Sequence, residues 1–336
     1  MKRDARKFFF SFVGLLVLLS LTATVAEAAG KGDKVAYRLK WLRNVSVVGA
    51  LYAEGRGLFE QQGLAVEVKA GGPERDAIRE LELGYADFGE ASADQVLRAR
   101  AKGAPVVVIA QLFQINPLQW MYRPEDLAIK GLADLRGKSI GVTFGGNDET
   151  VMRTLLSEAG LGDGDVRLHS VRYDYTPFYR RQVQLWPVYR NAQGPILAAQ
   201  LEREGEKVAF FSPEEFGVRF VANCVITSER TLRERPQLVQ RFLSALLAGW
   251  RQALEPQNQE DTLAILEKND PDTPRPILQQ QLHITRGLIA PEAGPAIGTI
   301  DRAAWEQTER IMRVQKQLPQ RVDVAAILRP LPPLGN

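Results

Sequence analysis

Ser139 is the residue of this sequence that comes nearest to a catalytic motif. It lies in Gly137-Lys138-Ser139-Ile140-Gly141, which matches the G-x-S-x-G pattern of a serine nucleophile. That pattern works when a strand precedes the serine and a helix follows it, because the tight turn then exposes the hydroxyl. Here a helical turn precedes Ser139 and a β-rich run follows it. We therefore predict that Ser139 begins a strand and is not a nucleophile.

Metal and acid–base chemistry have few candidate side chains. The sequence contains one cysteine, Cys224, and two histidines, His169 and His283. A single cysteine excludes an internal disulfide, a cysteine-based zinc site and an iron–sulfur cluster. Neither histidine has a metal-ligating residue at useful spacing, and Cys224 lies in an apolar run typical of a buried thiol. We expect no metal, no cofactor and no enzymatic activity.

Aromatic and amide side chains are better placed for binding a ligand than for catalysis. Aromatic rings stack on flat ligands, and asparagine amides donate to and accept from ring nitrogens and exocyclic amines. Many of these residues follow predicted strands, where the loops of an α/β sheet form its ligand crevice. The predicted ligand-binding residues are Trp41, Asn44, Ser92, Asp94, Phe113, Asn116, Gly145, Gly146, Asn147, Asp148, Glu149, Asp174, Trp186, Tyr189 and Asn191.

Alternating strands and helices are needed to bring these residues together. The continuous apolar run at 105–112 suits a strand buried on both faces, and 236–254 is the clearest amphipathic helix, with Pro236 at its start. The alternation restarts near residue 132, which predicts two α/β units, each with a mainly parallel sheet flanked by helices. The other predicted strands are 34–42, 64–69, 86–89, 139–144, 166–171, 185–189, 207–211 and 220–227.

Composition favours a folded protein with two domains. The chain has 336 residues, of which 45% are hydrophobic and 25% are charged, and this length usually exceeds one core. Lys and Arg number 43 against 40 Asp and Glu, a formal net charge of +3, and no basic run follows the N-terminal segment. A nucleic-acid partner is therefore not expected.

Residues 1–28 have the pattern of a cleavable signal peptide. A basic start is followed by an apolar run over 8–21, and Ala26-Glu27-Ala28 gives a small-x-small cleavage site. As a helix the apolar run would reach roughly 21 Å, which is short of the roughly 30 Å bilayer core. We expect export to the periplasm with cleavage after Ala28, and a membrane anchor is the minor alternative.

Five segments, which together run through most of the mature chain, carry a family resemblance. They are LKWLRNVSVVGALYAEGRGLFEQQGL (39–64), ADFGEASADQVLRARAKGAPVVVIAQLFQINPLQWM (86–121), DLRGKSIGVTFGGNDETVMRTLL (134–156), QLWPVYRN (184–191) and RERPQLVQRFLSALLAGWRQAL (233–254). In these segments the sequence resembles the solute-binding proteins of ABC importers. The branch it resembles holds binders of thiamine pyrimidine precursors together with sulfonate and nitrate binders.

The resemblance implies a type II periplasmic binding fold, in which two lobes joined by two hinge crossings close on a ligand in the cleft between them. It implies a discontinuous lobe I over 31–116 plus 222–320 and a lobe II over 117–221. The C-terminal tail, 321–336, is Pro-rich and is expected to be loose. A small-molecule solute and an ABC permease and ATPase are the implied partners, and we expect a monomer.

The positions that decide the ligand depart from the family pattern. Precursor binders typically carry an acidic residue before the first-strand Trp, a Pro before the Asn and one or two His after it. This chain has Lys40, Arg43 and Val47-Val48 there, and Gln184 stands where a small acidic residue is common. The identity of the solute is therefore open at the level of sequence.

Charge at one predicted helix start favours a ring over an anion. A helix N-terminus attracts anions, but Asp148 and Glu149 occupy the first turn of the helix predicted from Asn147. We therefore expect a neutral or weakly cationic heteroaromatic solute. The alternatives are a sulfonate- or nitrate-type anion binder, an exported ligand sensor for a signalling partner, and an enzyme like the eukaryotic pyrimidine synthases of similar fold.

Many predicted binding residues also have a purely structural interpretation. Aromatic residues of α/β proteins belong mostly to the core, paired glycines make tight turns, and first-turn acids stabilise helices. These interpretations apply to Trp41, Asp94, Phe113, Gly145, Gly146, Asp148, Glu149, Trp186 and Tyr189.

Overall fold

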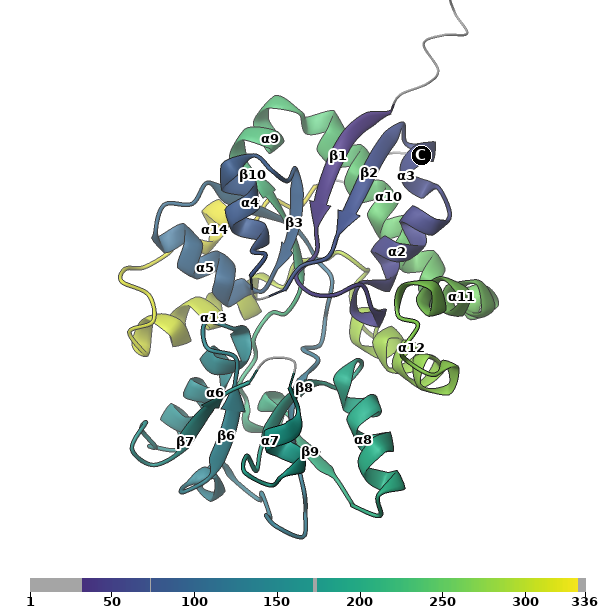
Figure 1. Cartoon of the computed structure of the whole chain (residues 1–336). Coiled ribbons are helices and arrows are strands. Elements are labelled where there is room, and N and C mark those ends of the chain that lie inside the picture. Colours follow the sequence, from purple (N-terminus) through teal and green to yellow (C-terminus); the bar gives the residue numbers. More distant parts are fainter. Residues whose placement is uncertain (1–31, 73, 172–173, 332–336) are drawn as a thin grey trace, which may run out of the picture.

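The computed structural model describes residues 32–72, 74–171 and 174–331. The predicted signal peptide, 1–28, lies outside these residues. The described chain forms two α/β lobes, drawn one above the other in Figure 1 and joined near the middle of the view. None of the helices in the described part combines the length and the apolar character that crossing a bilayer requires.

The sheet of lobe I has five strands in the order β2-β1-β3-β10-β4. β1 pairs in parallel with β2 and β3, whereas β10 is antiparallel to both β3 and β4. Four strands therefore share one direction, and β10, which returns from lobe II, is the reversed one. The bounds are β1 (Asp33–Arg38), β2 (Leu64–Lys69), β3 (Phe88–Ala91), β4 (Val106–Gln111) and β10 (Cys224–Ser228).

Lobe II repeats this arrangement with its own reversed strand. β5 is antiparallel to β8 and β9, and β6 is parallel to β7. A parallel bridge between Ile140 and Leu185 joins the two groups, which gives the order β7-β6-β8-β5-β9. The bounds are β5 (Leu118–Tyr122), β6 (Ser139–Val142), β7 (Arg167–Ser170), β8 (Trp186–Tyr189) and β9 (Ala209–Phe211). The predicted α/β fold of two mainly parallel sheets is confirmed.

Helix α10 (Pro236–Leu254) organises one face of the lobe I sheet. Its ring at Phe242 stacks on Phe88 of β3, with centroids 3.8 Å apart, and meets Tyr37 of β1 edge-on at 5.0 Å. Figure 1 shows α10 running beside β1 and β2. The other elements of lobe I are η1 (Val45–Val47), α2 (Val48–Gly55), α3 (Leu58–Gln61), α4 (Ala77–Leu83), α5 (Ala93–Ala101), α9 (Glu229–Glu234), η4 (Pro256–Asn258), α11 (Gln259–Asn269), α12 (Arg275–Ile289), α13 (Arg302–Val314) and α14 (Val324–Ile327).

Lobe II has a smaller set of helices and a separate aromatic core. Trp186 of β8 lies against Phe178, with ring centroids 6.0 Å apart, and both rings are buried. The elements that cover its strands are η2 (Leu132–Leu135), α6 (Asn147–Glu158), α7 (Thr176–Tyr179), α8 (Gln193–Arg203) and η3 (Pro213–Phe216).

The chain crosses between the lobes twice, over 112–117 and over 217–223. Asn116 connects the two crossings, because its side-chain amide donates to the Phe220 carbonyl at 2.8 Å. Its Oδ1 accepts from the Leu118 amide at the start of β5, at 3.0 Å. The boundaries expected between residues 116 and 117 and between 221 and 222 stay predictions.

Two expectations about the elements are wrong. Residues 118–122 form β5 at the centre of the lobe II strands, although no strand was expected there. The expected tail is not loose over 324–328: Ile327 is fully buried and Leu328 pairs with Val108 of β4. The apolar side chains of Val324, Ile327 and Leu328 fall on one side of the short helix α14, and burying them fixes the segment.

Close packing of α10 on α2 depends on glycine. A Cβ atom at Gly249 would lie 2.3 Å from the Gly49 carbonyl oxygen and 2.7 Å from the Ala53 Cβ. A backbone atom cannot move aside as a flexible side chain does, so the helices would have to separate. By contrast, a Cβ at Gly287 of α12 meets nothing within 4 Å.

We predict that Gly249→Ala lowers the free energy of unfolding by about 1–3 kcal/mol, because it overpacks this contact. Gly287→Ala should raise it by about 0.5–1 kcal/mol, since alanine is the better helix former. Urea denaturation followed by circular dichroism measures both. Equal effects of the two substitutions would contradict the close approach of α2 and α10.

Candidate functional site

Lys40 joins the two lobes. It follows β1 in lobe I, and its Nζ donates to the Tyr189 hydroxyl at 3.0 Å and to Asn147 Oδ1 at 3.2 Å, both in lobe II. The same Nζ lies 5.6 Å from the centroid of the Tyr189 ring. The carboxyl ends of β1 and β8 and the start of α6 therefore meet at one place, as the predicted topology requires.

Arg98 makes a second connection between the lobes. From α5 it donates to Thr150 Oγ1 at 2.8 Å and to the Gly145 carbonyl at 3.2 Å, both in lobe II. Its charge is balanced by Asp94 of the same helix, at 2.6 Å. We call the region where these side chains meet the interlobe junction, and it is defined by Lys40, Arg98, Gly145, Asn147, Thr150 and Tyr189.

Asp94 and Ser92 lie beside the junction and are buried. Ser92 is the N-cap of α5, and its hydroxyl donates to Asp94 Oδ1 at 2.5 Å. The other oxygen of Asp94 accepts from Arg98, so both oxygens have protein partners. Their interactions support the helix start and the Arg98 connection, and their contact with a ligand stays a prediction.

The start of α6 is occupied by its own carboxylates. Asp148 Oδ2 accepts from the Thr143 amide at 2.6 Å, and Glu149 Oε2 accepts from the Gly145 amide at 2.7 Å. Gly145 has φ +81°, a left-handed conformation that favours glycine, and this turn lets the two side chains reach back. Burial raises the pKa of Asp148 to about 6, although its hydrogen bonds with Thr143 favour the ionised form. The positive end of the helix is thus neutralised by the chain itself.

Glu90 is a buried carboxyl group that sequence analysis missed. It lies on β3, accepts from the Tyr37 hydroxyl at 2.5 Å and from the Asn223 amide at 3.2 Å, and is 1% exposed. Burial raises the pKa of Glu90 to about 7, although Tyr37, Asn223 and the nearby Lys40 charge favour the ionised form. The only sequence signal was an acidic residue within an otherwise apolar strand.

The charge of Lys40 is maintained by its surroundings. Burial disfavours the ammonium form, but Tyr189, Asp94 and Asp148 outweigh it and hold the pKa of Lys40 above its usual value. Lys40 is therefore a fixed cation at neutral pH. It was singled out in the sequence as a departure from the family pattern, but it was not predicted to be a site residue.

Two of the predicted ligand rings are core residues. Trp186 is 1% exposed and packs among Met121, Phe178 and other apolar residues of lobe II. Phe113 is equally buried in the core of lobe I. The expectation that these rings line the opening is wrong, because Trp186 points from β8 into the lobe II core and Phe113, in the first crossing, lies in the lobe I core. Trp41 and Tyr189 are only partly buried, and Phe144, after β6, is 52% exposed.

The remaining predicted residues have structural partners, most of them local and one in the other lobe. Asn44 Oδ1 caps η1 through the Ser46 amide at 3.0 Å. Asn191 is buried and donates to Thr285 Oγ1 at 3.0 Å, which adds a further contact between the lobes. Asp174 is exposed and accepts from the Thr176 amide at 2.9 Å. A Cβ atom at Gly146 would lie 2.8 Å from the Thr143 carbonyl, so this glycine is required by the turn.

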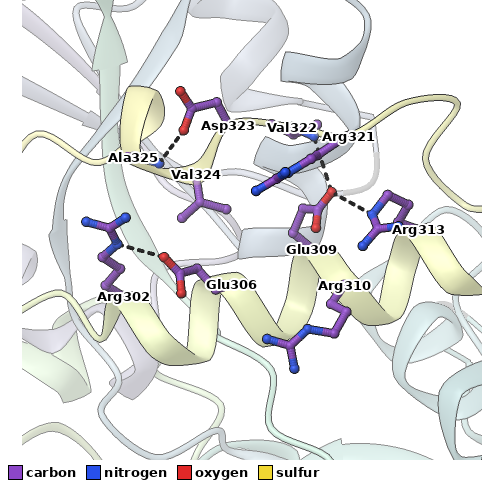
Figure 2. A pocket seen from close by; sticks show the side chains of 10 residues that line it. All are labelled: Arg302, Glu306, Glu309, Arg310, Arg313, Arg321, Val322, Asp323, Val324 and Ala325. Atoms are coloured by element: carbon purple, nitrogen blue, oxygen red, sulfur yellow. Dashed lines mark hydrogen bonds and ion pairs between the residues drawn. The ribbon is translucent and has the colours of Figure 1, made fainter.

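A pocket of about 610 Å³ lies away from the junction, between α13 and residues 321–325. Figure 2 shows its charged lining, in which Arg302 pairs with Glu306 and Arg313 with Glu309. Arg310 points to the side of α13 opposite the 321–325 segment (Figure 2). None of the predicted ligand-binding residues lines it. Across residues 32–72, 74–171 and 174–331, no three His, Cys, Asp or Glu side chains are grouped as metal ligands would be.

Comparison with known families and proteins finds relatives that align with most of the chain. The profile described as NMT1/THI5 like matches residues 44–260. A protein of Haemophilus influenzae named for thiamine biosynthesis is 28% identical over 253 residues, 73% of each chain. The riboflavin-binding protein RibY of Chloroflexus aurantiacus is 24% identical, covering 93% of this chain and 94% of its own. The formylaminopyrimidine-binding protein of Halalkalibacterium halodurans is 24% identical, covering 89% and 91%.

One relative is named as an enzyme, and the similar solved structures include both a transport binding protein and a desulfurization enzyme. A 4-amino-5-hydroxymethyl-2-methylpyrimidine phosphate synthase of Legionella pneumophila is 24% identical over 298 residues, 87% of this chain and 90% of its own. The periplasmic aliphatic sulphonate binding protein SsuA of Escherichia coli superposes with a TM-score of 0.70 at 18% identity, covering 91% of this chain and 94% of its own. At that identity the match establishes the fold alone.

The buried carboxyl group of Glu90 makes stability depend on pH. Its pKa is raised from 4.5 to about 7 in the folded state, which corresponds to about 3 kcal/mol. Between these two values the unfolded chain has released its proton and the folded chain has kept it, so stability falls as pH rises. This contribution of Glu90 to the free energy of unfolding is fully present below about pH 4.5 and is lost by about pH 7.

We predict that Glu90→Gln abolishes this pH dependence. The free energy of unfolding of the variant, relative to that of the wild type, should rise by about 2–3 kcal/mol from pH 5 to pH 8. Urea unfolding at both pH values measures it. Glu158→Gln, at the exposed end of α6, is the control and should change nothing. A Glu90→Gln difference that is independent of pH would show that the carboxyl is ionised throughout.

Proposed function

The chain belongs to the NMT1/THI5-like family, and from that premise we propose that it is an exported solute-binding protein. It captures a small heteroaromatic solute, similar to a thiamine pyrimidine precursor, between its two lobes. It then delivers that solute to the permease and ATPase of an ABC importer. The observation that carries the proposed solute class is the balance of charge at the interlobe junction.

That balance disfavours a small anion. Asp94, Asp148 and the partly protonated Glu90 lie near Lys40, and in the described part of the chain Lys40 and Arg98 oppose their charge. The N-terminus of α6, which would otherwise attract an anion, is occupied by Asp148 and Glu149. A sulfonate or nitrate would enter against this charge. A neutral or weakly cationic ring would not.

Aromatic and amide groups on both sides of the junction support a flat ligand. Trp41 comes from lobe I and Tyr189 from lobe II, and both are only partly buried. Asn147 lies beside Tyr189 and offers both a donor and an acceptor. Stacking on each ring contributes about 0.5–1.5 kcal/mol beyond burial. The relatives named for formylaminopyrimidine and for riboflavin are named for ligands with flat rings.

Capture without chemical change is the favoured mode. Ser139 begins β6, at the end of the strand remote from the junction. Burial raises the pKa of the Cys224 thiol, which keeps it protonated and unreactive. The synthase among the relatives makes an enzyme the second candidate. Conversion of a bound pyrimidine, detected by mass spectrometry, would separate the enzyme from the binding protein.

Export and transport follow from the same proposal. The segment 1–28 would direct the chain to the periplasm and be removed after Ala28. The partner is an ABC permease with its ATPase, and a sensor kinase is the alternative that the same closing lobes would serve. Uptake of labelled solute by cells that lack this gene distinguishes them, because a sensor would leave uptake intact.

We predict that the protein purified from the periplasm and denatured and refolded to remove bound solute is stabilised by aminopyrimidines. A solute at 100 times its dissociation constant should add about 2.7 kcal/mol, which a thermal-shift screen detects readily. The screen includes 4-amino-5-hydroxymethyl-2-methylpyrimidine, formylaminopyrimidine, thiamine, riboflavin, taurine and nitrate. A response to taurine or nitrate alone would overturn the ring ligand.

The two tryptophans should behave differently. Trp41→Ala should weaken binding of the ring about tenfold and leave the fold intact, because Trp41 follows Lys40 directly in the chain and is only partly buried. Trp186→Ala should instead cost about 3–5 kcal/mol of stability, since it empties the lobe II core. Tyr85→Ala is the control, because Tyr85 is 67% exposed and precedes β3, at the end of the strand remote from the junction. Titration calorimetry and thermal unfolding measure these effects, and normal binding by Trp41→Ala would remove it from the site.

A further inference from the structure

Lys40 occupies the kind of place in which proteins usually bind a ligand's cation. Its ammonium is held by an amide oxygen and a phenol oxygen of the opposite lobe, at 3.2 and 3.0 Å. It lies 5.6 Å from the centre of an aromatic ring. Asp94 and Asp148 act on it electrostatically. A ring face, neutral acceptors and carboxylates are the surroundings that favour a bound cation.

Lys40 has a donor to spare. An ammonium group carries three N–H donors, and the described residues supply acceptors for two of them, Tyr189 and Asn147. We assign the third donor, for which the described residues supply no acceptor, to a ligand at the junction. A ligand that presents a ring nitrogen or a carbonyl oxygen can accept from it, whereas a protonated or quaternary nitrogen cannot.

The charges around Lys40 place a second restriction on the chemistry of the ligand. Glu90 and Asp148 are buried carboxyl groups close enough to act on Lys40 electrostatically, and Arg98 is already paired with Asp94. The carboxyl groups of Glu90 and Asp148 would repel an anion. The same groups can accept a hydrogen bond from an amino group of a neutral ring. The junction therefore suits a molecule that brings both an acceptor and a donor and carries no net charge.

We propose that Lys40 is the specificity-determining residue of this protein, an internal cation that selects neutral acceptor-bearing rings and rejects permanently cationic ones. This inference rests on the proposed function, because it requires that the solute binds at the interlobe junction. It goes beyond that function by assigning the discrimination between two ligands of the same pyrimidine chemistry to one side chain.

The test compares two probes that share a pyrimidine. One is 4-amino-5-hydroxymethyl-2-methylpyrimidine, which is neutral near pH 7.5, and the other is thiamine, which adds a permanent positive charge. Titration calorimetry at pH 7.5 gives the ratio of their dissociation constants for the wild type, Lys40→Met, Lys40→Arg and Lys102→Met. Lys102 is exposed and follows α5, so its substitution controls for the loss of one positive charge.

The wild type should bind the neutral ring at least about tenfold more tightly than thiamine. Lys40→Met should weaken the neutral ring about tenfold, the value of one lost hydrogen bond from a charged donor, and bring the ratio close to one. Lys40→Arg should keep most of the discrimination, and Lys102→Met should behave as the wild type. A thermal unfolding curve confirms that each variant is folded.

The ratio separates specificity from a simple connection between the lobes. If Lys40 only holds the lobes together, Lys40→Met weakens both probes equally and the ratio stays unchanged, which overturns the inference and leaves the proposed function standing. If the wild type binds neither probe, the proposed function and this inference fall together. If thiamine binds the wild type as tightly as the neutral ring, the inference is wrong.

Discussion

A positive charge in a half-buried place must be balanced by groups that stay near it, and here those groups come from both lobes. Lys40 belongs to the end of β1, while the oxygens that accept from it belong to Asn147 and Tyr189. Separating the lobes would leave the ammonium without these partners. It would also break the hydrogen bond that Arg98 donates to Thr150. The closed arrangement is thus stabilised by contacts that the protein makes with itself.

The two reversed strands explain why these particular residues meet. β10 enters the lobe I sheet from lobe II, and β5 enters the lobe II strands from lobe I, each antiparallel to its neighbours. The four parallel strands of each lobe then point their carboxyl ends at the other lobe. The loops that follow β1, β3, β6 and β8 are therefore assembled at one junction, although they are far apart in the sequence.

Sequence patterns were sufficient where one periodicity dominates. The helix at 236–254 and the strand at 64–69 were predicted to the residue, because apolar spacing and proline or glycine neighbours mark both. β5 was missed because its five residues, all buried except Gln119, show no alternation of polar and apolar side chains. The burial of Trp186 was missed for a related reason: a strand residue must point to one of two faces, and the local sequence does not say which face is the core. Glu90 and Lys40 acquire their importance only from neighbours more than fifty residues away, Asn223 for Glu90 and Asn147 and Tyr189 for Lys40.

One architecture can carry different charge patterns at the junction between its lobes. The sulphonate-binding protein of Escherichia coli has this fold, with a TM-score of 0.70, yet only 18% of the aligned residues are identical. A helix N-terminus by itself favours anions, and α6 begins at the interlobe junction. In this chain Asp148 and Glu149 accept from the loop amides at that terminus, and the buried Glu90 and the fixed cation Lys40 complete a charge pattern without a strong anion site. Few side chains set that pattern, and none of the strands has to move for it to change.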